Sequence, residues 1–299
     1  MRSSLLNRFK PLLLWVALPL AALALLVACA PTATLNAIAA SEAATPDPAV
    51  AYGPLPRQRL DIYRPSSAAP TAGWPVVVFF YGGSWNRGER ADYKFVGTAL
   101  ASRGVLTLVA DYRLYPEVRY PEFLNDCALA AAHGLAQAAR LGGDPKRVFV
   151  MGHSAGAYNA AMLALDPRWL HSAGHSPAEL AGWIGLAGPY DFLPMKNPDT
   201  QPVFLHPNYP ARSQPVDHTV KASPRAFLGA AVTDSLIDPQ RNTVGLATRL
   251  QAAGAPVQLR LYERVNHLTL AAAFAWPLRW LAPVLDDVTA FINTAPAPP

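Results

Sequence analysis

The run Gly152–Gly156 reads Gly-His-Ser-Ala-Gly and carries a serine whose setting suits nucleophilic chemistry, Ser154. It follows an apolar, strand-like run at residues 147–151 and precedes a helical pattern at residues 155–165. In this context the pattern G-x-S-x-G predicts a nucleophile elbow, a sharp and strained turn that exposes the serine hydroxyl. The two glycines are expected because neighbouring backbone must approach where a Cβ atom would clash. Ser154 is therefore the candidate nucleophile.

A serine nucleophile requires a base and an acid later in the chain. The hydroxyl is weak until a base takes its proton, and the base needs a carboxylate that fixes its tautomer. Where the serine sits on such an elbow, the acid and then the histidine follow it in sequence. Among the five histidines after Ser154, His267 is the one that follows a late strand, at residues 257–262. The sequence therefore predicts His267 as the base.

The acid is expected in the loop after the apolar run at residues 225–230, where two aspartates qualify. Asp234 is favoured because it comes first after that run. Asp238 stays open as the alternative, although it precedes a proline and could instead lead into the next helix. Asp191 is a third and more distant candidate.

Attack on a carbonyl creates an oxyanion, so hydrogen-bond donors must already point at that oxygen. The amide of Ala155, first in its helix, is one expected donor. The run Tyr81–Trp85 reads Tyr-Gly-Gly-Ser-Trp and follows a strand at residues 76–80, and its exposed amides predict Gly83 and Ser84 as the others. No cluster of His, Cys or acidic residues has metal-ligand spacing, so we expect no metal.

The elements that would position these residues alternate between strand-like and helical patterns. This alternation predicts a mostly parallel sheet with helices on both faces, and the strands are continuous apolar runs, as in buried parallel sheets. A more mixed run at residues 57–63 fits an edge strand. The other expected strands span residues 76–80, 105–110, 147–151, 183–187, 225–230 and 257–262, and the expected helices span residues 93–102, 122–141, 155–165, 243–253 and 284–292.

One segment interrupts this alternation, because residues 189–224 contain eight prolines. Proline disfavours both helices and central strands, and a long irregular insertion inside a compact domain is usually functional. We therefore expect a cap over the site. The aromatic and aliphatic side chains expected to line the substrate pocket are Tyr190, Phe192, Leu193, Phe204, Leu205 and Tyr209.

Residues 1–29 combine three basic residues, an apolar run and a final cysteine, which is typical of an export signal. The residues Leu26–Cys29 also resemble the bacterial lipobox, in which the cysteine is lipidated. We therefore expect an exported bacterial lipoprotein, anchored to a membrane through Cys29 and facing the periplasm or the cell exterior. A plain cleaved signal or an uncleaved anchor helix are the alternatives.

The remaining chain divides into a flexible tether at residues 30–50, one folded domain at residues 51–293 and a disordered tail at residues 294–299. Hydrophobic residues make up 52% of the chain and charged residues 15%, which argues against general disorder. The net charge of +5 falls to +2 without the three basic residues of the leader. No nucleic-acid partner is therefore expected.

With these motifs in place, the chain resembles the small alkyl esterases of the α/β-hydrolase superfamily. These include hormone-sensitive-lipase-like carboxylesterases, feruloyl-esterase-like proteins and arylformamidases. The resemblance covers about residues 55–293. It rests on Tyr81–Trp85, Asp111–Leu114, Tyr120–Pro121, Gly142–Pro145, Gly152–Gly156, Asp234–Ile237 and His267.

The resemblance implies an α/β-hydrolase fold that carries a catalytic triad of Ser154, Asp234 and His267. It also implies oxyanion donors at Gly83, Ser84 and Ala155. The implied function is hydrolysis of short-chain or aryl carboxylic esters, with a small-molecule ester substrate and no cofactor. The alternatives are an arylformamidase-like amide hydrolase and a catalytically silent binding protein on the same scaffold.

The chain departs from the family pattern at three places. Tyr81 stands where the family usually has His, Ala230 and Ala231 replace a usual His-Gly pair, and Asp238 replaces a usual Pro.

Overall fold

The structure is a computed structural model that describes residues 34–37 and 46–294. The expected signal segment, with Cys29, and the tail after residue 294 lie outside the described residues. Within the described ranges, no helix has the length and apolar character needed to cross a bilayer.

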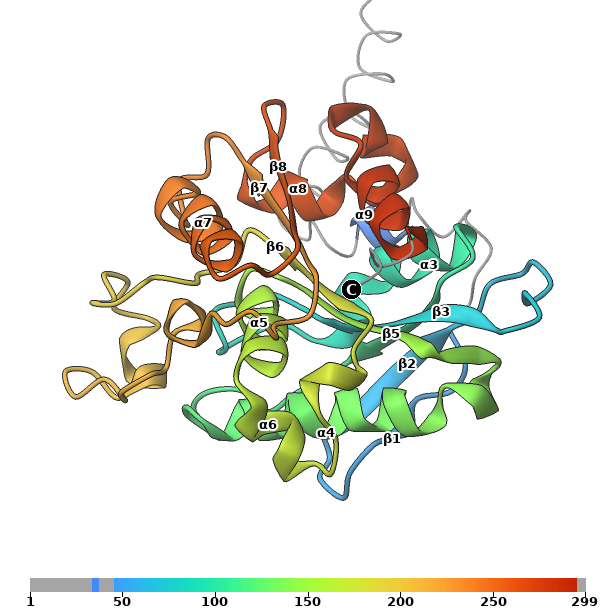
Figure 1. Cartoon of the computed structure of the whole chain (residues 1–299), viewed down its shortest axis with the longest axis horizontal. Coiled ribbons are helices and arrows are strands. Elements are labelled where there is room, and N and C mark those ends of the chain that lie inside the picture. The colour runs from blue at the N-terminus through green and yellow to red at the C-terminus, as the bar shows by residue number, and fades with distance from the viewer. Residues whose placement is uncertain (1–33, 38–45, 295–299) are drawn as a thin grey trace, which may run out of the picture.

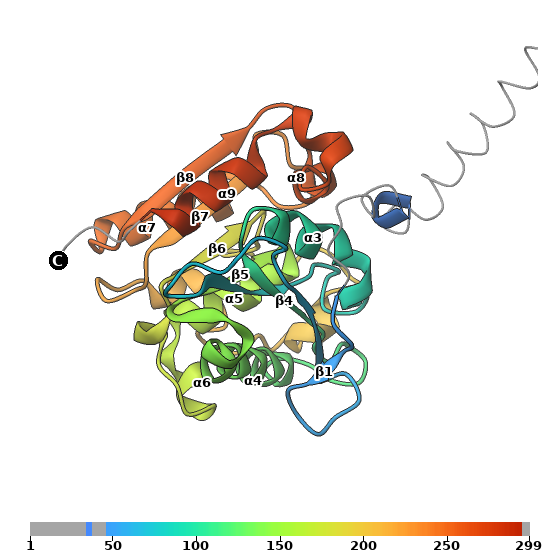
Figure 2. The same cartoon turned by 90° about the vertical axis from the view of Figure 1, so that its right-hand side faces the viewer.

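A single eight-stranded sheet forms the centre of the molecule, with the strand order β1-β2-β4-β3-β5-β6-β7-β8 (Figures 1 and 2). The strands from β4 to β8 in this order run parallel, whereas β1 and β2 are antiparallel to their neighbours. The bounds are β1 Val50–Ala51, β2 Arg59–Tyr63, β3 Trp74–Phe80, β4 Leu106–Ala110, β5 Gly143–His153, β6 Gly182–Leu186, β7 Ala226–Ala231 and β8 Val257–Tyr262.

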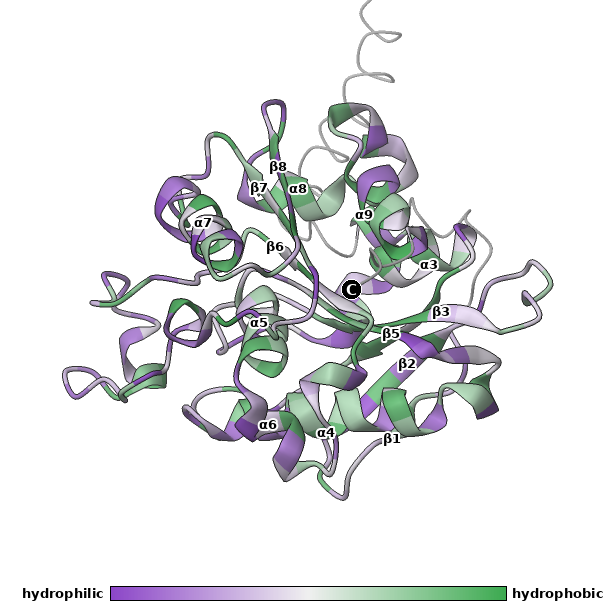
Figure 3. Ribbon diagram, in the orientation of Figure 1, coloured by the Kyte–Doolittle hydropathy of each residue, from purple (hydrophilic) through white to green (hydrophobic). Residues whose placement is uncertain are grey.

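Helices cover both faces of the sheet, with α3 and α9 on one face and α4, α5 and α6 on the other (Figure 2). Hydrophobic residues are frequent on the central strands and on α5 (Figure 3). The α-helices are α3 Lys94–Ser102, α4 Glu122–Gln137, α5 Ala155–Leu165, α6 Pro167–Ser172, α7 Gly245–Ala252, α8 His267–Ala272 and α9 Val284–Asn293. Short helices of other types are η1 Arg90–Tyr93, η2 Ala139–Leu141, η3 Pro177–Glu179, η4 Gln201–Phe204, η5 Pro215–His218, η6 Gln240–Val244 and η7 Trp276–Leu281.

The sheet confirms the predicted fold class, since every expected strand is present at or close to its expected place. The central strands are buried along their whole length, which explains their continuous apolar sequences. One detail differs: β2 is not the edge strand, because the two residues of β1 pair outside it, with Val50 opposite Leu60.

Parts of the predicted tether contact the folded domain. In the helical turn at residues 34–37, the Asn36 side chain donates to the carbonyl oxygen of Ala91 at 2.7 Å and accepts from the amide of Phe95 at 3.1 Å. Further along, Asp47 accepts from Arg64 at 2.8 Å. The turn at residues 34–37 and the stretch around Asp47, both within the predicted tether, therefore contact the folded domain.

The proline-rich segment at residues 189–224 is irregular, as predicted, and holds only the two short turns η4 and η5. It is nevertheless attached firmly to the domain. The Tyr158 hydroxyl donates to the carbonyl oxygen of Ser213 at 2.7 Å, and the Tyr120 amide donates to that of Val203 at 2.9 Å. The segment is thus a packed insertion of the domain.

The parallel strands bring the predicted functional residues to one edge of the sheet. Gly83 follows β3, Ser154 follows β5, Asp234 follows β7 and His267 follows β8, each beyond the carboxyl end of its strand. In open α/β sheets, this edge is where ligands bind.

Candidate active site

Ser154 lies on a strained turn between β5 and α5, with φ 54° and ψ −122°. A Cβ atom on Gly152 would overlap the carbonyl oxygen of Gly156, and one on Gly156 would overlap that of Phe80. Both positions therefore require glycine, as the sequence motif predicts. The turn is held by the Ser154 amide, which donates to the carbonyl oxygen of Leu186 at 2.8 Å.

His267 joins Ser154 to Asp234 through two hydrogen bonds. Its Nε2 lies 2.9 Å from Oγ of Ser154, and its Nδ1 lies 2.7 Å from Oδ2 of Asp234. The carboxylate only accepts, so Nδ1 carries the proton and Nε2 is left to accept from the serine hydroxyl. The three residues that the sequence predicted as a triad are therefore in contact, in the orientation that proton transfer from Ser154 requires.

Asp234 is fixed by its own loop. Its Oδ1 accepts from the amides of Leu236 and Ile237, each at 2.9 Å, while Oδ2 faces His267. Burial acts to raise the pKa of Asp234, but the bonds from His267 and from the two amides outweigh it and hold that pKa below its ordinary value. Asp234 is therefore ionised at neutral pH and able to stabilise a protonated His267.

The two other candidate acids, Asp238 and Asp191, form hydrogen bonds with residues other than His267. Asp238 accepts from the amides of Gln240 and Arg241 at 2.9 and 3.2 Å, at the start of η6. Asp191 accepts from the guanidinium of Arg241 at 2.9 Å. Both carboxylates line the same cleft as Asp234, but Asp234 is the one that contacts the histidine.

The loop after β3 adopts backbone conformations that expose its amides. Gly83 has φ 127° and Ser84 has φ 55°, and a Cβ atom on Gly83 would overlap the carbonyl oxygen of Arg87. Among the described residues, no acceptor binds the amides of Gly83, Ser84 or Ala155. All three residues line the cleft beside Ser154, as the predicted oxyanion donors would.

His153 lies next to the triad, and the sequence pattern does not predict a role for it. Its Nε2 is 2.9 Å from the carbonyl oxygen of His267, and its Nδ1 is 3.3 Å from the hydroxyl of Tyr93. That hydroxyl also accepts from the amide of Gly82 at 3.3 Å. Burial is the main cause that lowers the pKa of His153, to about 3. Only its place in the Gly-His-Ser-Ala-Gly motif could have drawn attention to it.

A cleft of about 910 Å³ opens over these residues, which is within the size range of small-molecule sites. The proline-rich insertion contributes one wall of it, from Pro189 to Thr200. The large apolar side chains of the lining include Trp85, Phe192, Met195, Leu236, Ile237 and Leu268.

The expected pocket residues of the insertion are corrected by this cleft. Phe192 lines it, whereas Tyr190 and Phe204 are fully buried in the core and Leu205 is exposed. Leu193 and Tyr209 are also absent from the lining. Proline density indicated an insertion near the site, but it carries no information about which side chains turn toward the cleft.

Comparisons with known proteins agree with this fold. The chain is 30% identical over 243 residues to a probable isoprenylcysteine alpha-carbonyl methylesterase of Oryza sativa subsp. japonica, which covers 74% of this chain and 56% of the relative. It is 28% identical over 146 residues to the kynurenine formamidase of Danio rerio, covering 49% and 47% of the two chains. The chain thus spans about half the length of the curated relatives it matches.

Among solved structures, the apo form of Thermogutta terrifontis esterase 2 superimposes with a TM-score of 0.68. It shares 21% sequence identity, and the alignment covers 84% of this chain and 96% of the esterase. This likeness shows the α/β-hydrolase fold. Residues 60–242, well over half of the chain, match the sequence profile of the BD-FAE family. The chain is therefore a member of the BD-FAE family, with an α/β-hydrolase fold.

Proposed function

We propose that the protein is a serine carboxylesterase that hydrolyses short-chain or aryl carboxylic esters through an acyl-enzyme on Ser154. The observation that carries this proposal is the continuous hydrogen-bonded series from Asp234 through His267 to Ser154. The relatives named as methylesterases support the ester as the bond that is cleaved.

In the proposed mechanism, His267 takes the proton of Ser154 as its Oγ attacks the ester carbonyl carbon. Asp234 stabilises the imidazolium that forms, and the amides of Gly83, Ser84 and Ala155 bind the oxyanion. His267 then gives the proton to the leaving alcohol, which leaves the acyl group on Ser154. Water attacks this ester with His267 again as the base, and the carboxylic acid is released.

The test compares the purified protein with its Ser154→Ala variant on nitrophenyl acetate and with a fluorophosphonate probe. Removal of the nucleophile should lower turnover by about 10⁴ to 10⁶ and abolish labelling. Ser235→Ala is the matched control, because Ser235 is an exposed serine that lines the same cleft. Equal labelling of folded Ser154→Ala and the parent would disprove the assignment, and an inactive, unlabelled parent would favour the silent binding protein.

Formamide hydrolysis is the second candidate, favoured by the similarity to a kynurenine formamidase. The same triad would attack a formyl carbonyl, with an arylamine as the leaving group. A panel of acyl esters and formyl-arylamines, assayed side by side, separates the two. A higher kcat/KM for the formyl-arylamines than for every ester would replace the esterase proposal.

We further propose that the protein is exported and anchored to a membrane through a lipid on Cys29. The support is the order of basic residues, apolar run and cysteine in residues 1–29.

A further inference from the structure

The two ends of the loop that carries the candidate oxyanion donors, Tyr81–Gly88, lie close together. It leaves β3 at Tyr81 and reaches Gly88 before η1 begins. Gly88 has φ 101°, and a Cβ atom there would come within 2.9 Å of the carbonyl oxygen of Gly82 and 3.0 Å of the Tyr81 ring. Whatever holds these two ends together also holds the amides of Gly83 and Ser84 between them.

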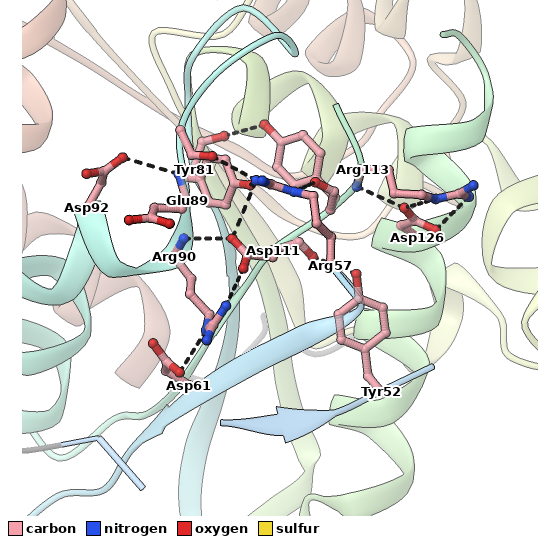
Figure 4. Close-up of polar contacts among 12 residues, drawn as sticks. Tyr52, Arg57, Asp61, Tyr81, Glu89, Arg90, Asp92, Asp111, Arg113 and Asp126 are labelled. Carbon is pink, nitrogen blue, oxygen red and sulfur yellow. Dashed lines mark hydrogen bonds and ion pairs between the residues drawn. The ribbon is translucent and has the colours of Figure 1, made fainter. Parts of the chain in front are cut away.

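One guanidinium binds both ends of this loop (Figure 4). The Nη2 of Arg57 donates to the hydroxyl oxygen of Tyr81 at 2.7 Å and to the carbonyl oxygen of Gly88 at 2.8 Å. Its Nε donates to the carbonyl oxygen of Tyr112 at 3.0 Å. Arg57 comes from the turn before β2, so it ties the loop to a separate part of the domain.

Tyr81 and Tyr112, which accept hydrogen bonds from Arg57, are held in place by contacts of their own. The Tyr81 side chain is fully buried and stacks on the Tyr112 ring at 4.7 Å between centroids. The Tyr112 hydroxyl donates to the backbone carbonyl oxygen of Tyr81 at 2.8 Å. Burial raises the pKa of Tyr81 well above its ordinary value, so its hydroxyl remains neutral and accepts from Arg57.

The carboxylate of Asp111 forms an ion pair with the Arg57 guanidinium. Asp111 is almost fully buried and lies 3.8 Å from Nη2 of Arg57. It also accepts from the amide of Arg90, at 2.7 Å, and from the Arg90 guanidinium. Arg90 opens η1, directly after the loop, so the charged network in Figure 4 continues from Arg57 to the segment that follows Gly88.

We propose that Arg57 is a positioning residue for ester hydrolysis, which fixes the oxyanion donors Gly83 and Ser84 by clamping both ends of their loop. This inference rests on the proposed function, since the position of these amides matters only if they bind an oxyanion. Arg57 itself is one third exposed and lies outside the cleft lining, so it acts through the loop. Loss of one preorganised oxyanion donor typically lowers turnover by about 10²- to 10³-fold, and loosening two donors should have a smaller effect.

The test is Arg57→Ala, with Arg59→Ala as the matched control. Arg59 is an exposed arginine two residues away on β2. We expect kcat of Arg57→Ala to fall by about 10- to 100-fold while KM changes by less than about threefold, because the loop binds the transition state. The affinity for a trifluoromethyl ketone, which forms a tetrahedral adduct on the serine, should fall by the same factor as kcat/KM. Millimolar guanidinium ion should restore part of the lost kcat in Arg57→Ala and leave Arg59→Ala unchanged.

A second variant keeps the proposal testable if Arg57→Ala folds poorly. Tyr81→Phe preserves the buried ring and removes only the hydroxyl that Arg57 binds. It should lower kcat by about 3- to 10-fold, with KM unchanged. A purely structural role for Arg57 would lower stability but leave kcat of the folded fraction and the adduct affinity intact, and that result would overturn the inference. Failure of the proposed function would appear differently, as an inactive and unlabelled parent protein.

Discussion

The Nε2 of His153 lies 2.9 Å from the backbone carbonyl oxygen of His267. A carbonyl oxygen only accepts, so Nε2 of His153 carries the proton, and in the neutral ring Nδ1 must accept. It accepts from the Tyr93 hydroxyl, whose oxygen in turn binds the amide of Gly82. Burial raises the pKa of Tyr93 to about 12, so this hydroxyl keeps its proton. One neutral histidine thus joins the backbone of the base to the start of the oxyanion loop.

This arrangement predicts a pH dependence of stability. The pKa of His153 is about 3 in the fold and about 6.5 in the unfolded chain, so between these values only the unfolded state binds the proton. Stability should therefore fall as the pH drops below about 6.5, by up to about 1.4 kcal/mol per pH unit from this group. In His153→Gln, which retains a donor but does not titrate, urea unfolding between pH 7 and pH 5 should show a shallower loss.

The control for this measurement is His171→Gln, because His171 is exposed. Its loss of stability between the two pH values should match that of the parent. If His153→Gln and the parent lose the same free energy of unfolding, His153 is not held neutral by the fold.

The contacts of the two loop aspartates predict losses of turnover of very different size for the same substitution. Asp234→Asn keeps the shape of the side chain but favours the wrong tautomer of His267, so turnover should fall by about 10⁴. In Asp238→Asn, the amide oxygen can still accept from Gln240 and Arg241 at the start of η6, and the loss should stay under about tenfold. Steady-state kinetics with melting temperatures test this, and a larger loss for Asp238→Asn would reassign the acid.

The lipid anchor is predicted from the sequence of residues 1–29, in which Leu26–Cys29 resemble the lipobox. In a bacterial host, the full chain should partition with membranes and carry acyl groups on an amino-terminal Cys29. Cys29→Ser should prevent the modification, whereas Cys127→Ala should not, because Cys127 is buried in α4. Mass spectrometry of the mature amino terminus measures this directly. An unmodified chain that begins beyond Cys29 would identify a simple secretory signal.

The features that the sequence could predict are those with a local cause. Continuous apolar runs predicted the buried strands, and the glycine pattern around Ser154 predicted the turn, because a Cβ atom on Gly152 would overlap the backbone of Gly156, four residues away. The order of strands then placed His267 and the loop of Asp234 at the same edge of the sheet. What distinguishes Asp234 from Asp238 physically is which of two nearby carboxylates reaches the imidazole.

Features that depend on distant contacts escaped prediction for a physical reason. Arg57 meets Gly88 across 31 positions, and His153 meets His267 across 114. No periodicity or composition records such pairs, since each side chain alone resembles an ordinary polar residue. The inward or outward direction of a side chain in an irregular segment is equally hidden, because such a segment has no period.

Phe192 and Phe204, both in the irregular insertion, illustrate this. Both were expected to line the substrate pocket, but Phe192 faces the cleft while Phe204 is fully buried. The rings within 6.0 Å of Phe204 are those of Trp85, Tyr120, Phe123, Tyr158 and Phe192.

Phe204→Ala should therefore lower the free energy of unfolding by about 3 to 5 kcal/mol, because it leaves a cavity in an aromatic cluster. Phe192→Ala should cost less stability, because its ring is only partly buried, and should shift the preference among nitrophenyl esters toward longer acyl chains. Urea unfolding and kcat/KM across acyl lengths measure the two effects on both variants. An unchanged acyl profile in Phe192→Ala would mean that the acyl group lies against another wall of the cleft, since only a side chain in contact with substrate can change which chain length fits.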